Sequence, residues 1–389
     1  MVYDPYAPAA DPRYDEMAAI RAAGGVAATP AGWFVATATG VESGLRQVDK
    51  FVGSFTDTSV LPDDDVVISA IPEPRHGRIR RVINTVVALH RANDAEPFIR
   101  ETSARLVEDA LRTNAAQGYV DLVAAVVDPL PSAVIAHLLG APAEDEEQFR
   151  IWSDELLERQ GSTEPKALAD IHPEFAAYIA ALIDRHRAMP DPPDDIITRF
   201  LGTSVDGELL SDRAVCTQTM FLIISGNETT RNLIGNALFT LAGDPALYTR
   251  VRADRSLVPV VVEESLRHDS PVQVLGRAVL ADTEIGGVEL HPGDRVVFGI
   301  ASANRDEGVY ADADAFSIDR RRPREHLAFG TGPHVCPGAT LARLEATTML
   351  GAVCDRVASM SLVDGFVPVP NPVFWALGQR RLDAVVVPA

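Results

Sequence analysis

One long helical pattern constrains the fold of this chain more than any other feature. It begins at Ser211 and Asp212 and continues to Pro245. At the usual rise per residue, such a helix is roughly 45–50 Å long, enough to cross the whole molecule. Shorter helical patterns accompany it at 97–118, 120–140, 144–160 and 171–188. No shift in composition marks a second domain along the chain.

The middle of this helix departs from its own apolar pattern. An apolar run is interrupted by the string Ser225 to Thr229, whose polar groups are costly to bury without a purpose. Gly226 would let another group approach the helix closely. Thr229 can turn its hydroxyl to the carbonyl four residues earlier, which opens the helix locally, and Glu228 adds a carboxylate at the same level. Two simpler interpretations stay open: Glu228 pairs with Arg231 on a surface face, and the threonines only pack.

A second feature is the glycine-rich loop from Phe329 to Gly338, which precedes a helical run from Ala339 to Leu350. Its glycines permit tight turns and the close approach of something bulky. Cys336 lies just before the helix, where unpaired N–H groups favour a thiolate. The sequence therefore predicts a nucleophile or a metal ligand at Cys336. The alternative is a buried, inert cysteine.

Basic residues recur at positions where an anion would suit them. His76 and Arg80 are four residues apart and share one helix face, which suits a carboxylate, although a solvated basic face is the simpler interpretation. Arg277 lies among apolar residues, where an unpaired guanidinium would be costly. Glu264 and Arg267 are spaced for a bidentate ion pair.

Together these motifs resemble the cytochrome P450 superfamily of haem–thiolate monooxygenases. The loop from Phe329 to Gly338 is similar to the haem-ligand motif Phe-Gly-x-Gly-x-His-x-Cys-x-Gly, with every motif position filled. The string Ser225 to Thr229 resembles the oxygen-activating motif, small-Gly-x-acid-Thr, with Ser225 in place of the usual Ala or Gly and Asn227 in the free position. The motifs follow the family's order along the chain, from His76 to Gly338.

The resemblance implies a mainly α fold with small β-sheets, the cytochrome P450 fold, forming one domain over residues 1–389. It also implies haem b between the long helix and the cysteine loop, with Cys336 as the thiolate ligand of the iron. Thr229 and Glu228 are implied to be catalytic: Thr229 would hydrogen-bond the dioxygen, and Glu228 would help to relay protons from solvent. The pair of Glu264 and Arg267 is implied to be structural and locked to the later meander. The residues implied to bind haem are His76, Arg80, Gly226, Arg277, Phe329, His334 and Gly338.

The implied activity is insertion of one oxygen atom of O2 into a hydrophobic small molecule such as a steroid, terpene, fatty acid or polyketide. Electrons are expected from a ferredoxin and a ferredoxin reductase. Two alternatives stay open: a peroxide-driven peroxygenase, and a haem-binding sensor or carrier without turnover. The acid–threonine pair favours the monooxygenase, because only that reaction needs a proton relay. The expected apolar pocket residues are Phe221, Ile224, Val272, Val274, Phe374 and Trp375.

Composition narrows the possible partners and the expected location. The formal net charge of −20 makes nucleic acid and anionic membranes poor partners. The 3 cysteines have no disulfide-framework spacing, which indicates a reducing compartment. Neither a signal peptide nor an apolar run long enough to span a bilayer is evident. We therefore expect a cytoplasmic protein that does not enter the membrane.

Overall fold

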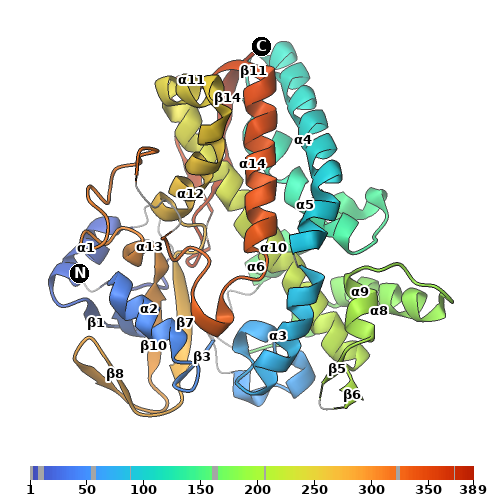
Figure 1. Ribbon diagram of the computed structural model, residues 1–389, viewed down its shortest axis with the longest axis vertical. Coiled ribbons are helices and arrows are strands. Elements are labelled where there is room, and N and C mark those ends of the chain that lie inside the picture. The colour runs from blue at the N-terminus through green and yellow to red at the C-terminus, as the bar shows by residue number, and fades with distance from the viewer. Residues whose placement is uncertain are drawn as a thin grey trace.

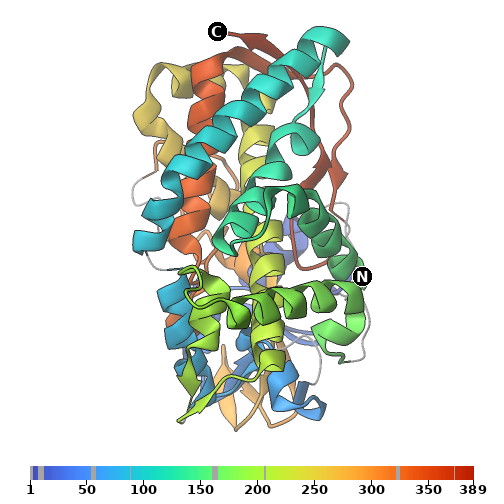
Figure 2. The same cartoon turned by 90° about the vertical axis from the view of Figure 1, so that its right-hand side faces the viewer.

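The long helix predicted from the sequence is the central element of the structure. The computed structural model describes residues 3–7, 13–53, 58–87, 89–159, 165–205, 207–320, 325–371 and 373–389. Helix α10 (Asp212–Gly243) runs through the middle of the molecule for most of its height (Figure 2). Ser211 Oγ caps its first turn by accepting a hydrogen bond from the Ala214 N–H at 3.0 Å. Asp244 and Pro245 end it, because Asp244 caps the next helix, α11 (Pro245–Ala253).

Two hydrophobic clusters pack other helices against α10. One joins α4, α10, α12 and α14 through residues such as Ile99, Leu238, Val262 and Met349, and α4 and α14 stand side by side (Figure 1). The other joins α3, α5, α6, α8, α9 and α10 on the opposite half of the molecule. The bounds of these and the shorter helices are α1 (Tyr14–Ala22), α2 (Ala38–Arg46), α3 (Arg75–Val86), α4 (Leu89–Gln117), α5 (Pro129–Leu138), α6 (Glu146–Arg159), α7 (Leu168–Ile171), α8 (Pro173–Ala188), α9 (Ile196–Leu201), α12 (Val258–His268), α13 (Ile300–Ala303) and α14 (Ala339–Arg356).

The largest sheet joins the N-terminal part of the chain to a segment more than 200 residues later. Its strand order is β1-β2-β10-β7-β3, with β10 parallel to β2 and the other pairs antiparallel. The remaining described strands form one sheet of three strands and three hairpins. The bounds are β1 (Val26–Thr29), β2 (Gly32–Val35), β3 (Phe51–Gly53), β4 (Val120–Asp121), β5 (Ser204–Val205), β6 (Glu208–Leu209), β7 (Val274–Val279), β8 (Thr283–Ile285), β9 (Val288–Leu290), β10 (Arg295–Gly299), β11 (Val357–Leu362), β12 (Val369–Pro370), β13 (Gln379–Arg381) and β14 (Asp383–Pro388). The predicted mainly α fold with small sheets is confirmed.

The helix predicted over 120–140 is wrong at its start. Strand β4 comes first, and a π-helical turn at Val123–Val127 separates it from α5. Asp121 Oδ1 accepts hydrogen bonds from the N–H groups of Val123 and Leu382, at 3.0 and 2.9 Å, which ties the segment to β14. This long-range pairing overrides the local helical pattern, and a continuous helix resumes only at Pro129.

The segment from Val60 to Ile71 packs against the core, although acidic residues interrupt its apolar ones. It forms three short 3-10 helices whose residues Ile68 and Ile71 are buried in the second hydrophobic cluster. The Asp65 carboxylate is buried as well and forms an ion pair with Arg213 of α10 at 2.6 Å. The apolar residues among the aspartates therefore anchor the segment to the core.

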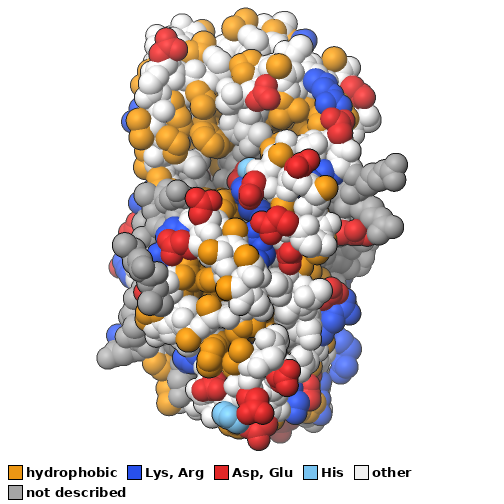
Figure 3. Space-filling model, turned by 90° about the vertical axis from the view of Figure 1, so that its left-hand side faces the viewer, with side chains coloured by type: hydrophobic (Ala, Val, Ile, Leu, Met, Phe, Trp, Pro, Cys, Tyr) orange, Lys and Arg blue, Asp and Glu red, His pale blue; other side chains and the backbone are white. Residues whose placement is uncertain are grey.

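The surface carries the excess of acidic side chains predicted from the composition. On the face shown in Figure 3, acidic side chains are spread from top to bottom, and hydrophobic side chains gather in one patch above and one below the middle. Within the described ranges, no helix is both long enough and apolar enough to cross a membrane.

Candidate active site

The cysteine loop is held in a compact shape by its glycines. Gly332 has a φ of +73°, and a Cβ there would lie 3.1 Å from both the Leu45 carbonyl oxygen and the Arg46 Cα of α2. Only glycine meets both conditions, positive φ and close contact with a backbone. The Cys336 N–H donates to the Phe329 carbonyl at 2.8 Å, which closes the loop. Cys336 is thereby fixed just before the first turn of α14.

The Cys336 thiol is suited to hold a metal that has no other protein ligand. Burial raises its pKa, while hydrogen bonds from the Gly338 and Ala339 N–H groups and the charges of Arg80 and Arg343 oppose that rise. The predicted thiolate therefore needs a further positive partner to form. In the described part of the chain, no cluster of three or more His, Cys, Asp or Glu side chains could bind a metal ion. A metal bound to Cys336 would have to be carried by a cofactor.

Two histidines from separate elements meet beside this loop. The rings of His76, on α3, and His334 stack with centroids 3.8 Å apart. His76 Nδ1 lies 2.8 Å from Glu73 Oε1, whereas its buried Nε2 has no hydrogen-bond partner in the part of the chain that the structure describes. Arg80, one turn further along α3, donates to the Val335 carbonyl. The predicted face of α3 thus points at the cysteine loop, and His76 Nε2 is available to an acceptor.

Arg277 adds a buried positive charge to this site. The Arg277 guanidinium, on β7, donates to the Gly276 carbonyl at 2.8 Å, and no carboxylate of the described residues lies within ion-pair distance of it. Burial lowers the pKa of Arg277 to about 10. Burial, together with the charges of His76, Arg277 and Arg80, lowers the pKa of His334 to about 3. A buried arginine without a carboxylate partner among the described residues, set beside Arg80 and two histidines, fits a dianionic group such as the two propionates of a haem.

Helix α10 has an open face in its middle. Gly226 is exposed, and a Cβ there would meet only Ile135 Cδ1, at 3.9 Å. The Thr229 hydroxyl donates to the Ser225 carbonyl at 2.6 Å, which confirms the predicted contact four residues back along the helix. The alternative interpretation that the threonines only pack is right for Thr230, which is buried.

Glu228 is more deeply placed than either interpretation of the sequence expected. It forms an ion pair with Arg231, as the alternative proposed, but its carboxylate is fully buried and not on a surface face. Asn232 Nδ2 donates to Glu228 Oε1 at 2.8 Å, and Asn371 Nδ2 donates to the same oxygen. Burial raises the pKa of Glu228, and Arg231 opposes that rise. Asn371 was missed because it is 143 residues away along the chain and no local pattern marks it.

The Glu264–Arg267 pair is confirmed as a structural lock. Arg267 is buried, and its Nε and NH2 atoms donate to the two Glu264 oxygens at 2.9 and 2.8 Å. It also donates to the carbonyls of Asn304, Ala313 and Ala315 in the meander. Arg320 also belongs to this lock, because its Nε donates to Glu264 Oε1 at 2.9 Å.

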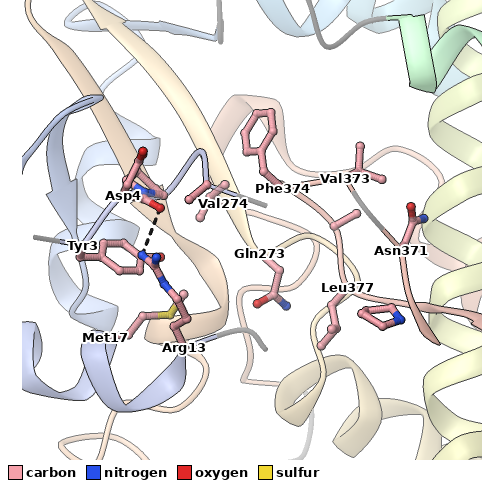
Figure 4. Close-up of a pocket in the computed structure, with 14 residues that line it drawn as sticks. Tyr3, Asp4, Arg13, Met17, Gln273, Val274, Asn371, Val373, Phe374 and Leu377 are labelled. Carbon is pink, nitrogen blue, oxygen red and sulfur yellow. Dashed lines mark hydrogen bonds between the residues drawn. The ribbon is translucent and has the colours of Figure 1, made fainter. Parts of the chain in front are cut away.

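The predicted apolar pocket residues fall into two groups. Phe221, Ile224 and Trp375 pack in the second hydrophobic cluster, and Val272 pairs with Ala376 in an isolated β-bridge. Val274 and Phe374 instead line a small pocket of about 40 Å³ that is partly open to solvent. Its other walls include the N-terminal residues Tyr3, Asp4 and Arg13 on one side, with Asn371 beside α10 on the other (Figure 4).

Comparisons with known proteins agree with this geometry. The family model for cytochrome P450 matches residues 46–356. Cytochrome P450 109 of Bacillus spizizenii is 34% identical over 325 residues, covering 81% of this chain and 78% of the relative. A steroid C26-monooxygenase of Mycobacterium tuberculosis is 33% identical over 323 residues, covering 82% of this chain and 85% of the relative.

Solved structures match over nearly the whole chain. The crystal structure of CYP109E1 from Bacillus megaterium in complex with testosterone has a TM-score of 0.83 at 31% identity, and covers 98% of this chain and 99% of that one. A mutant of P450 EryK in complex with erythromycin B has a TM-score of 0.86 at 29% identity, with coverage of 96% and 95%. Together, these matches show that the chain belongs to the cytochrome P450 family of oxidoreductases.

Proposed function

We propose that this chain is a haem b monooxygenase acting as a single unit over residues 1–389, with a hydrophobic small molecule as its substrate. The balanced reaction takes a substrate C–H bond, O2, two electrons and two protons to the hydroxylated product and water. When bound, a haem with a thiolate ligand supplies the cleavage of the O–O bond. The protein must then hold the cofactor, position the substrate and deliver the protons.

The observation that carries this proposal is the group of basic residues beside Cys336, in which the buried Arg277 has no carboxylate partner among the described residues. His76, Arg80, Arg277 and His334 come from three separate elements, and each of the first three lowers the pKa of His334. Two carboxylates placed among them would remove this repulsion. Cys336 would then be the metal ligand, with the Gly338 N–H donating to its sulfur.

Two further residues would border the cofactor. Gly226 leaves the open face of α10 free for a flat group. Phe329 would support the cysteine loop beside the cofactor, since the Arg343 guanidinium lies 4.4 Å from the centroid of the Phe329 ring.

Proton delivery is assigned to Glu228 and Thr229. The Thr229 hydroxyl donates to the carbonyl of Ser225, the residue directly before Gly226, and therefore lies on the same side of α10 as that carbonyl. Glu228 follows Gly226 by two positions and has a carboxylate whose burial favours the protonated form. A peroxide-driven enzyme or a haem sensor would not need such a group, which is why we favour the monooxygenase.

The substrate class is proposed from the pocket lining and from relatives. One relative is a steroid C26-monooxygenase, and one similar structure holds testosterone. Val274 and Phe374 offer apolar walls that suit a hydrophobic molecule. Electrons are proposed to come from a ferredoxin and its reductase, and the cytoplasm remains our proposed location. A Soret titration with steroids, terpenes, fatty acids and polyketides tests the substrate class; no spectral shift with any of them would contradict it.

The relay is tested by comparing Thr229→Val with its neighbour, Thr230→Val. Both changes keep the side-chain shape, but only the first removes a hydroxyl from the open face of α10. We expect Thr229→Val to bind substrate normally and to lose product formed per electron consumed by roughly tenfold, with peroxide released instead. Thr230→Val should behave as the parent protein. Equal coupling in both variants, or full turnover driven by peroxide alone, would contradict the monooxygenase proposal.

A further inference from the structure

Three carboxylates from three elements surround one guanidinium behind the open face of α10. Arg231 forms an ion pair with Glu228 through NH2. Its NH1 lies 2.6 Å from Asp154 Oδ1 on α6 and 3.9 Å from Asp128 Oδ1, the residue before α5. The four residues, which we term the Arg231 cluster, thus join α5, α6 and α10 at the level of the proposed relay.

The Arg231 cluster has too few cations for its acids. The other cation that faces it, among the described residues, is Arg150, whose NH1 lies 3.0 Å from Asp154 Oδ2. Arg150 is itself neutralised by Glu147, which accepts from its Nε and NH2 at 3.0 and 2.7 Å. Three carboxylates therefore share one uncommitted cation, and an excess of buried negative charge favours retention of a proton.

The side chains of the cluster differ in their exposure to solvent. Side-chain exposure is 29% for Asp154, 21% for Asp128, 12% for Arg231 and 0% for Glu228. Asp154 is well paired because it contacts both Arg231 and Arg150. Among the described residues, the ion pair of Asp128 is the long contact to Arg231 alone. Burial raises the pKa of Asp128 to about 6, with Asp154 and Glu228 adding to the rise and Arg231 and Arg150 opposing it. Asp128 is therefore the outer carboxyl group that a proton reaches first.

We propose that the Arg231 cluster holds one exchangeable proton, carried by Asp128 or by Glu228 according to which of them Arg231 contacts, and that Asp128 is a positioning residue for proton delivery. This inference rests on the proposed function, because it deepens the role assigned there to Glu228. Neutral Asp128 leaves Arg231 to Glu228, which stays a carboxylate. When Asp128 loses its proton it attracts Arg231, and Glu228 gains a proton as its cation withdraws.

This exchange conserves both charge and protons. One carboxyl group is ionised and the other neutral before and after the step, and Arg231 follows the negative charge. Asn232 and Asn371 keep the Glu228 side chain in place throughout, since both donate to Oε1 while Arg231 contacts Oε2. When Glu228 delivers its proton, the cluster is left without an exchangeable proton, and Asp128 then takes up another proton from solvent.

The test is an infrared pH titration of the full-length, haem-loaded protein at rest. We expect a protonated-carboxyl band in the parent protein that disappears with a midpoint near 6. Asp128→Asn should abolish that band and flatten the pH dependence of product formed per electron consumed, while leaving the substrate-induced spectral shift unchanged. Burial raises the pKa of Glu345, which lies outside the cluster, to about 8, so a second protonated-carboxyl band is expected from it. The variant Glu345→Gln removes this second band and so identifies it.

Two further variants keep the test decisive. Arg231→Gln removes the cation that opposes protonation of Asp128, so the midpoint should rise by about one pH unit or more even if Asp128→Asn folds poorly. Glu158→Gln alters an exposed acid of the same helix, α6, which pairs with Arg380 at 3.1 Å outside the cluster. It should leave both the band and the coupling profile as in the parent protein.

The outcomes separate this inference from the proposed relay. A band that survives Asp128→Asn, or a coupling profile that Asp128→Asn does not change, would overturn the role of Asp128. Glu228→Gln provides the distinction: if it lowers coupling while Asp128→Asn does not, the relay stands and only the shared-proton cluster is wrong. If Glu228→Gln leaves coupling intact, the proposed relay itself fails.

Discussion

Replacing Glu345 by glutamine should make the protein more stable at neutral and alkaline pH. Glu345 lies on α14, two turns beyond Cys336, and its side chain is only 3% exposed. Its Oε2 has no hydrogen-bond partner among the described residues. Burial without a partner raises the pKa of Glu345 from 4.5 to about 8. The folded protein therefore keeps this carboxyl group neutral at pH values where the unfolded chain ionises it.

The size of the effect follows from this difference in pKa. Below about pH 4.5 both states are protonated and the group has no influence on stability. As pH rises from there towards 8, only the unfolded state loses its proton, so the free energy of unfolding falls by up to about 4 to 5 kcal/mol in total. Glutamine has the same shape and does not ionise. Between pH 5 and 7.5, the stability of Glu345→Gln relative to the parent protein should therefore rise by about 3 kcal/mol.

Urea unfolding of both haem-loaded proteins, followed by far-UV circular dichroism across this pH range, measures the difference. Glu101→Gln, an exposed carboxylate on α4, is the matched control and should give a constant difference at every pH. If the difference between Glu345→Gln and the parent protein were also independent of pH, or fell as pH rose, the argument that Glu345 is buried neutral would be refuted.

Two other predictions concern the structural lock and the open face of α10. Arg267→Lys should lower the free energy of unfolding by about 3 to 5 kcal/mol, because an ammonium cannot replace the five hydrogen bonds of the buried guanidinium. Urea unfolding beside Arg356→Lys, which changes an exposed pair with Glu108, measures this, and a loss below about 1 kcal/mol would contradict a buried lock. Gly226→Ala should stabilise the cofactor-free protein by about 1 kcal/mol through helix propensity, yet weaken haem uptake by narrowing the open face. Haem titration and thermal unfolding of the apoprotein test the two effects, and unchanged uptake would show that nothing approaches Gly226 closely.

Features with a local cause could be predicted from the sequence. The cysteine loop depends on Gly330 and Gly332, which both have positive φ, and at Gly332 the nearby backbone leaves no room for a side chain. These two glycines lie close together in the chain. The Thr229 contact depends on a spacing of four residues within one helix. The face shared by His76 and Arg80 has the same origin. These expectations were met because helix geometry alone determines them.

Features that depend on partners far away along the chain could not be predicted from the sequence. Glu228 was correctly paired with Arg231, but its burial depends on Asn371, which arrives from the C-terminal segment. Arg231 in turn is shared with Asp154 and Asp128, and no local pattern connects these acids with α10. The break of the helix predicted over 120–140 likewise follows from the pairing of β4 with β14, 261 residues away between Asp121 and Leu382. In each case a tertiary contact outweighs the local signal.

The central claim is that Cys336 binds the iron of a haem as a thiolate. The most direct measurement is the carbon monoxide difference spectrum of the reduced, haem-loaded protein, taken beside Cys336→Ser and Cys354→Ser. Cys354 is a buried free cysteine further along α14 and serves as the matched control. The long-wavelength Soret band typical of thiolate ligation should be present in the parent protein and in Cys354→Ser, and absent from Cys336→Ser. A parent protein without that band, or a band that persists in Cys336→Ser, would contradict the assignment.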